Sequence, residues 1–355
     1  MFSRRLSDNA LFNLIALLFG GILFWLTRFV DFTYDDISQI IFNTNLHHGL
    51  DWHKIFNDEL RAHRLIQNIT FALNWSMSGI KLWSYHLFNV SFHVLNSVLL
   101  FRLLKRMGLP TNVMWLAAVL FLVHPLQLEA VTYIMGRNEL LKMLVTLTAL
   151  LLYTNPKRPK VVIHLLLAVG LLVKENCAIV PALFICWDLT VGRLPWRELA
   201  WREHAFYISH VLWLFLWRSF LNFDAGQEFI GFDLFPFWDY VVANLYHAWF
   251  YLLLFINPAE QSIYHEWNPS PPLYGVILGT LFLVTLCGLF FRWRKAQPLV
   301  AFMIFFFALS YLPNNSFLQF VNPFVENRLY QANAALFCLF AYAMMASLRW
   351  RKVAT

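Results

Sequence analysis

Membrane-length apolar segments constrain this chain more than any other feature of its sequence. A helix needs about 20 mostly apolar residues to cross a bilayer, and eleven apolar segments follow one another from end to end. They lie near residues 10–30, 83–104, 111–127, 137–153, 161–174, 176–191, 204–221, 239–257, 272–291, 297–312 and 329–348. Only 13% of the residues are charged, against about 25% in soluble domains. The sequence therefore predicts an all-α polytopic membrane protein with about 10 to 11 transmembrane helices.

The basic residues indicate the orientation of these helices, because Lys and Arg are enriched in cytoplasmic loops. Of the 27 Lys and Arg, 17 fall in six clusters that we expect in the cytoplasm with both termini: Arg4/Arg5, Arg102/Lys105/Arg106, Lys157/Arg158/Lys160, Arg193/Arg197/Arg202, Arg292/Arg294/Lys295 and Arg349/Arg351/Lys352. Small clusters between apolar runs do not indicate a nucleic-acid partner. The outer face then receives the polar stretches at 31–82, 128–137, 174–176, 222–238 and 313–328. Eleven crossings cannot return the chain to the cytoplasm, so one segment must be re-entrant or interfacial, and we expect 239–257.

The whole of 1–355 is predicted to be one transmembrane domain. Its longest polar stretch, 31–82, has mixed apolar and polar spacing at 36–45 and 58–75. This spacing is typical of helices that lie along a membrane surface. The four Cys residues all fall inside apolar segments, which indicates small buried hydrophobes and not a disulfide framework.

Two adjacent carboxylates, Asp35 and Asp36, follow the first apolar segment. A hydroxyl nucleophile needs a carboxylate within reach, directly or through a metal ion. Asp is also favoured where a helix begins, so the pair by itself fits a helix cap as well as a general base. The sequence leaves open whether a divalent cation, Mg or Mn, is used, and these two residues would be its ligands.

A polar stripe marks the second apolar segment. His86, Asn89, His93 and Asn96 recur at positions that share one face of a helix. Polar side chains inside a span must face protein or water, so the stripe either bonds to neighbouring helices or lines a cavity. His86 and Asn89, nearest the outer surface, are the stronger functional candidates.

Charged residues interrupt the apolar pattern further along. His124 precedes a proline that ends a helix, and Glu129 and Arg137 flank the turn that follows. These two either form a buried ion pair, or Arg137 binds a phosphate as a fork donor. Lys174 and Glu175 lie between two apolar runs of about fourteen residues, which is short for full spans. That length fits helices that end below the surface, around a water-filled cavity.

The last apolar segment begins with Glu326, Arg328 and Tyr330. Arg328 at this depth either binds an anionic headgroup or snorkels to the interface, and the same alternatives hold for Arg64 and His265. The predicted orientation puts all these charges at the outer face. A cavity there, with acids and phosphate-binding cations, suits a lipid-phosphate donor that enters from the membrane and a hydroxyl acceptor that arrives from water.

One segment carries a family resemblance. His124-Pro-Leu-Gln-Leu-Glu-Ala-Val-Thr-Tyr-Ile-Met-Gly-Arg-Asn-Glu-Leu-Leu141 resembles the HP-x-x-x-EAV-x-x-x-x-GR-x-x-LL signature of the transmembrane and tetratricopeptide-repeat O-mannosyltransferases and their bacterial relatives. Further blocks match in the right order and extend the resemblance over most of the chain: Tyr34-Asp-Asp, His63-Arg-Leu, Tyr85 to His93, Leu172 to Glu175, and Glu326 to Tyr330.

The resemblance implies a GT-C fold and an inverting glycosyltransferase with a polyprenyl-phosphate sugar as donor. It implies Asp35 as the general base, with Asp36 as its partner or as a substrate or metal contact. Candidates for the donor phosphate or the pocket wall are Arg64, Arg137, Lys174, Arg328, Glu129, Glu175, His86, Asn89, His124, Glu326 and Tyr330. The acceptor is a hydroxyl group on a protein or glycan, and membrane lipids are the other partners.

The chain also departs from the family pattern. Asn327 separates Glu326 from Arg328, where the family has adjacent Glu and Arg, and no tetratricopeptide pattern is found. The short chain favours a bacterial enzyme of the inner membrane whose active site faces the periplasm. The alternative is a transporter or flippase of a lipid-linked sugar, which would need alternating access, usually built from repeated halves. No internal repeat supports that alternative.

Overall fold

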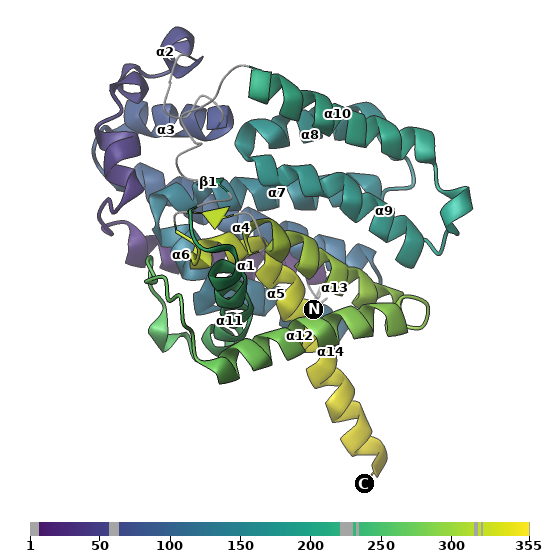
Figure 1. The fold of residues 1–355 in the computed structure, drawn as a ribbon. Coiled ribbons are helices and arrows are strands. Elements are labelled where there is room, and N and C mark those ends of the chain that lie inside the picture. The colour runs from purple at the N-terminus through teal and green to yellow at the C-terminus, as the bar shows by residue number, and fades with distance from the viewer. Residues whose placement is uncertain are drawn as a thin grey trace, which may run out of the picture. The chain divides into compact units, whose positions relative to one another are not determined.

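The computed structural model describes residues 7–56, 64–220, 230–231, 234–315, 319–320 and 322–354. Nearly all regular structure in these residues is helical (Figure 1). The described strands are β1 (Ile230–Gly231) and β2 (Gln319–Phe320), which pair antiparallel with Ile230 opposite Phe320. The prediction of an all-α polytopic protein is confirmed. The chain divides into two compact units, Met1–Cys177 with Phe340–Thr355, and Ala178–Leu339.

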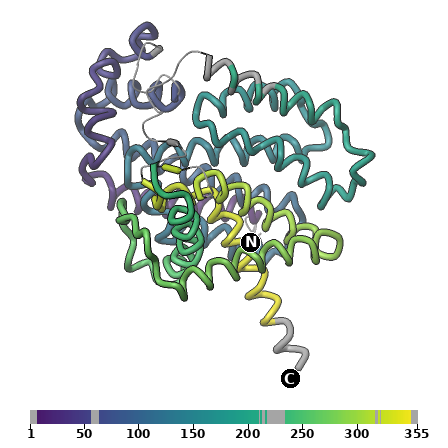
Figure 2. The backbone as a smooth tube through the Cα atoms, viewed as in Figure 1, coloured from purple at the N-terminus to yellow at the C-terminus, as the bar shows by residue number. Residues whose placement is uncertain are grey.

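The first unit is built around the long helix α4. Its main helices are α1 (Asp8–Thr27), α3 (Leu65–Ser78), α4 (Trp83–Arg106), α5 (Thr111–Val123), α7 (Arg137–Tyr153) and α8 (Lys160–Val173). Helix α4 packs against α1, α3, α5 and α7, and α7 packs against α8. Short helices lie in two connections. A π-helix (Ile37–Ile41), a 3-10 helix (Thr44–His48) and α2 (Trp52–Phe56) lie between α1 and α3, and α6 (Leu128–Thr132) lies between α5 and α7. The backbone path through these elements can be followed in Figure 2.

The second unit contains α9 (Val180–Thr190), α10 (Trp201–Phe220), α11 (Phe237–Ile256), α12 (Leu273–Trp293), α13 (Pro298–Tyr311) and the first part of α14 (Tyr330–Ala354). Helices α11 and α12 touch closely because two glycines of α12 face α11. A Cβ atom at Gly279 would lie 1.8 Å from the backbone oxygen of Leu245. Small residues permit this close approach of helices, as is common in membranes.

Every predicted apolar segment coincides with helical structure in the described residues. Five helices are long and apolar enough to cross a membrane, and a sixth span results if the bent pair Thr111–Val123 and Pro125–Thr132 counts as one. Helix α11 is among the five, so its length and composition do not mark 239–257 as the segment that fails to cross. The 14 residues of α8 and the 11 of α9 fit that role better. The total number of crossings stays a prediction.

Candidate functional site

The two adjacent aspartates differ completely in burial. Asp36 has 0% of its surface exposed, whereas Asp35 is exposed. The Asp36 carboxylate accepts hydrogen bonds from the backbone amides of Met135 at 2.8 Å and Thr33 at 3.1 Å. One carboxylate of the pair is therefore exposed, and the other ties the segment that follows α1 to the turn before α7.

The backbone around Asp35 is held at both ends. His86 of α4 donates from Nε2 to the backbone oxygen of Val30 at 2.8 Å, and Asp36 binds the turn on the other side. Between them Tyr34 has φ of +46°, in the left-handed region that bulky residues rarely occupy. The conformation that points Asp35 outward is thus imposed by its surroundings.

Burial changes the acidity of the second carboxyl group. Desolvation raises the pKa of Asp36 to about 7 from its ordinary value of 3.8, although the amides of Thr33, Met135 and Ile134 lower it in part. Apolar side chains cause the desolvation, since Ile40, Tyr85, Ile134 and Met135 belong to the hydrophobic cluster on this side of the unit.

Arg137 lies at the centre of a buried network and has 0% of its surface exposed. Its Nε donates to Asn89 Oδ1 at 2.8 Å, Nη2 to the Tyr85 backbone oxygen at 2.9 Å, and Nη1 to Asn74 Oδ1 at 2.5 Å and to Thr70 Oγ1 at 3.1 Å. All four acceptors are uncharged, and the alternative of an ion pair with Glu129 is not among these contacts. Its donors are committed to α3 and α4, which fits a structural cation and not a free fork for phosphate.

Asn89 joins this network to the turn that Asp36 binds. Its amide nitrogen lies 3.2–3.3 Å from the backbone oxygens of Val131, Tyr133 and Ile134. Gly136 completes the turn, because a Cβ atom there would lie 2.5 Å from the backbone oxygen of Ala130. The structure therefore explains two residues of the signature segment. Gly136 permits the tight turn, and Arg137 stabilises it through Asn89.

His124 and Glu129 shape the approach to this turn. The His124 Nδ1 accepts a hydrogen bond from the backbone amide of Leu126 at 3.2 Å, where the helix axis bends by 55°. Glu129 is buried on α6. The other two side chains of the polar stripe on α4 also bind backbone oxygens. His93 binds the Leu122 oxygen and Asn96 binds the Leu140 oxygen, both at 2.9 Å.

A second polar cluster in the same unit is rich in cations. Lys174 and Lys142 both form ion pairs with Glu139, and all three side chains are buried. Arg64 and Glu175, which are half-buried, lie close enough to act electrostatically on Lys174. Among the described residues, three cations face two carboxylates in this cluster, which leaves an excess of one positive charge. An excess of positive charge in a largely buried cluster favours an anionic ligand.

Arg64 occupies the position just before α3. Its Nε atom is buried and has no hydrogen-bond partner among the residues that the structure describes. A buried donor without a partner costs free energy, and an anion oxygen would satisfy it. His63 and the rest of 57–63 lie outside the described residues, as does most of the predicted 222–238 loop.

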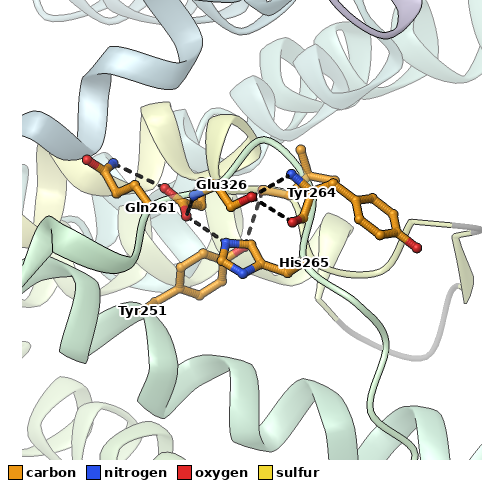
Figure 3. A network of polar contacts seen from close by, with 7 residues as sticks. Tyr251, Gln261, Tyr264, His265 and Glu326 are labelled. Atoms are coloured by element: carbon orange, nitrogen blue, oxygen red, sulfur yellow. Dashed lines mark hydrogen bonds and ion pairs between the residues drawn. The ribbon is translucent and has the colours of Figure 1, made fainter.

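The last predicted block lies in the second unit and is organised by Glu326. This carboxylate is 1% exposed and accepts hydrogen bonds from the Ser262 amide at 2.9 Å, the Gln261 side chain at 3.1 Å and His265 Nε2 at 2.7 Å (Figure 3). It thereby holds the segment that follows α11 against the beginning of α14.

Arg328 and Tyr330 have different surroundings. Arg328 is half-buried, donates to the Asn322 oxygen at 2.8 Å and lies over the ring of Phe320 at 4.7 Å. Tyr330 is fully buried where α14 begins. Glu326 thus has a defined role in holding a loop, and the role of Arg328 toward a ligand stays a prediction.

Two functional candidates were not predicted from the sequence. Glu139 and Lys142 fall inside the apolar segment 137–153, and the signal that identifies them is an opposite-charge pair three residues apart in a span. In the residues that the structure describes, no group of three or more His, Cys, Asp or Glu side chains is arranged to hold a metal ion. Asp36 is fully buried with both oxygens on backbone amides, and a metal-binding role for it with Asp35 stays a prediction.

Comparison with known proteins confirms the resemblance. The chain is 32% identical to protein O-mannosyl-transferase TMTC3 of Mus musculus over 189 residues, and 35% identical to TMTC3 of Homo sapiens over 147 residues. It is 25% identical to protein O-mannosyl-transferase F38B6.6 of Caenorhabditis elegans over 242 residues. No family model and no solved structure matches it.

These matches cover parts of each protein. They take in 48%, 38% and 63% of this chain, and 20%, 16% and 35% of the mouse, human and nematode relatives. The chain thus spans a fifth or less of the two TMTC3 proteins and about a third of the nematode protein.

Proposed function

We propose that this chain is an inverting membrane glycosyltransferase of the GT-C type. It moves a sugar from a polyprenyl-phosphate carrier to a hydroxyl group of a protein, at the outer face of a bacterial inner membrane with both termini in the cytoplasm. The printed names of the relatives support mannose as the sugar and protein as the acceptor. The observation that carries the proposal is an exposed carboxylate, Asp35, on a segment fixed at the end of the first apolar helix.

The proposed reaction assigns the proton to Asp35. Its carboxylate takes the proton of the acceptor hydroxyl as the oxygen attacks the anomeric carbon from the side opposite the phosphate. The bond between that carbon and the phosphate oxygen breaks, and polyprenyl phosphate leaves with the electron pair. The product carries the opposite anomeric configuration, and Asp35 releases its proton to water.

The cation cluster supports the donor assignment. Arg64, Lys142 and Lys174 can stabilise the negative charge that grows on the leaving phosphate. Glu139 keeps the two lysine side chains in place. Arg137 contributes indirectly in this scheme, since it supports the turn that Asp36 binds.

A transfer assay tests the proposal. The full chain in liposomes is given polyprenyl-phosphate mannose with a labelled sugar and a Ser/Thr-rich acceptor protein. We expect the labelled sugar to appear in the acceptor protein, and no labelled protein when the donor is nucleotide-activated mannose. A labelled donor that crosses the bilayer without any labelled protein would favour the flippase alternative and overturn the transferase.

Lys174→Met should weaken donor binding. The variant removes the excess positive charge but leaves Glu139 paired with Lys142, so the fold is retained. We expect the KM for the lipid-phosphate donor to rise about 10-fold with a smaller change in kcat. The matched control is Lys81→Met, which alters an exposed lysine of the first outer loop. An unchanged donor KM in a folded Lys174→Met protein would remove this cluster from the donor site.

A further inference from the structure

We propose that Asp36 is a positioning residue, whose carboxylate locks the segment that carries Asp35 onto the turn at Ile134–Gly136 and does not itself react. This inference rests on the proposed function, because it assigns Asp35 as the base. It assigns different roles to Asp35 and Asp36, which the sequence alone does not distinguish.

Both oxygens of the Asp36 carboxylate already accept hydrogen bonds from the backbone. Its Oδ1 accepts from the Met135 amide and its Oδ2 from the Thr33 amide. With 0% of the residue exposed, a substrate hydroxyl cannot come within the roughly 3 Å that proton transfer requires. A group in this position can hold the backbone, and it cannot serve as the base.

The turn at Ile134–Gly136 is itself held in place. Asn89 binds the backbone oxygens of Val131, Tyr133 and Ile134, Arg137 binds Asn89, and Gly136 packs where no larger residue fits. The contact between Asp36 and Met135 joins positions 99 residues apart. The base segment is therefore attached to the buried hydrogen-bond network around Arg137.

The segment that carries Asp35 is attached on both sides. His86 binds the backbone oxygen of Val30, and Asp36 binds the backbone amide of Met135, so Asp35 lies on a short segment fixed at both ends. The positive φ of Tyr34 within that span needs such support, because an unrestrained tyrosine avoids it. Release of Asp36 would let Tyr34 relax and turn Asp35 away.

The lock also depends on charge. A carboxylate accepts from both amides, whereas the protonated acid places an O–H against a donor. The groups that act on Asp36 are Asp35 in its own segment and Arg137 on α7, with Tyr85 and His86 as the titratable groups of α4. Burial raises the pKa of Asp36 to about 7, so the lock forms as pH rises through neutrality.

The main experiment compares Asp36→Asn and Asp36→Ala with the wild type in the transfer assay. An error of about 1 Å in the position of a catalytic group costs on the order of 100-fold in rate. We expect kcat to fall roughly 10- to 100-fold in Asp36→Ala and less in Asp36→Asn, with the donor KM unchanged. We expect the kcat of the wild type to rise near pH 7 and this rise to be absent in Asp36→Asn.

Thermal unfolding supplies a second pH readout with the opposite sign. The folded pKa of Asp36 is raised above 3.8, so its contribution to stability is fully present below that value. The contribution is lost as pH rises through about 7. The melting temperature of the wild type should therefore fall between about pH 4 and pH 7 more than that of Asp36→Asn.

Hydrogen exchange separates this inference from the proposed function. The amides of Thr33 and Met135 should be protected in the wild type, whether or not the chain transfers a sugar. Both should lose protection in Asp36→Ala, and one of them should lose it in Asp36→Asn, which keeps a single acceptor oxygen. Unchanged protection, or a wild-type kcat in Asp36→Ala, would overturn the lock. Activity that survives Asp35→Ala and disappears in Asp36→Asn would make Asp36 the base and also overturn it. Should the variants not fold, loss of this protection in the wild type between about pH 8 and pH 6 tests the same lock.

Discussion

Asp35→Ala is expected to abolish most of the transfer activity and to leave the fold intact. General-base catalysis contributes about 10²- to 10⁴-fold to a rate, so kcat should fall by about three orders of magnitude. Because the side chain is exposed, its removal leaves no cavity, and the melting temperature should stay close to that of the wild type. The measurement is the initial rate of transfer from polyprenyl-phosphate mannose at saturating donor.

The matched control for this variant is Asp31→Ala. Asp31 is another exposed aspartate in the same segment, four residues earlier. It should keep nearly full activity, since nothing in the proposed reaction uses it. Turnover by Asp35→Ala at a rate near that of the wild type would remove the base assignment, and equal losses in both variants would point to a general effect of charge in this loop.

Arg137→Met is expected to destabilise the protein more than any other single change discussed here. The methionine fills much of the volume but leaves Asn89, Asn74 and the Tyr85 backbone oxygen without their donor. Each buried acceptor without a partner costs about 1–3 kcal/mol, and the total loss should reach roughly 3–5 kcal/mol. The melting temperature and the folded yield in detergent measure this effect.

Two comparisons sharpen the result for Arg137. Arg102→Met makes the same chemical change at an exposed position of α4 and should have little effect on the melting temperature. Arg137→Lys keeps the charge but not the planar fork, so it should recover only part of the stability. A melting temperature of Arg137→Met equal to that of the wild type would show that the network does not support the turn.

The periodic apolar pattern predicted the helices well because bilayer thickness and helix rise restrict the length of a span. The segment 137–153 coincides with α7, and 239–257 lies within one residue or two of α11. The pattern also predicted that the two runs beside Lys174 and Glu175 are short for full spans, and α8 and α9 have 14 and 11 residues. Apolar composition by itself does not determine whether a short helix crosses or turns back.

The candidate site could be predicted in part. The sequence singled out Asp35 and Asp36 after the first helix and the signature segment at 124–141, and the structure joins the two through Asp36 and Met135. The sequence offered an ion pair between Arg137 and Glu129, whereas Arg137 binds uncharged groups of α3 and α4. Glu139 and Lys142 were not predicted, because their opposite charges cancel within an apolar segment.

What the sequence alone determined is the class of protein, the order of its helices and the two carboxylates, since these depend on local composition and spacing. The tertiary structure decided which carboxylate is exposed and which is buried. That difference arises from Met135, whose amide lies 99 residues away along the chain and 2.8 Å away in space. Contacts of this kind depend on how α3, α4 and the turn before α7 pack together, and no local pattern encodes them.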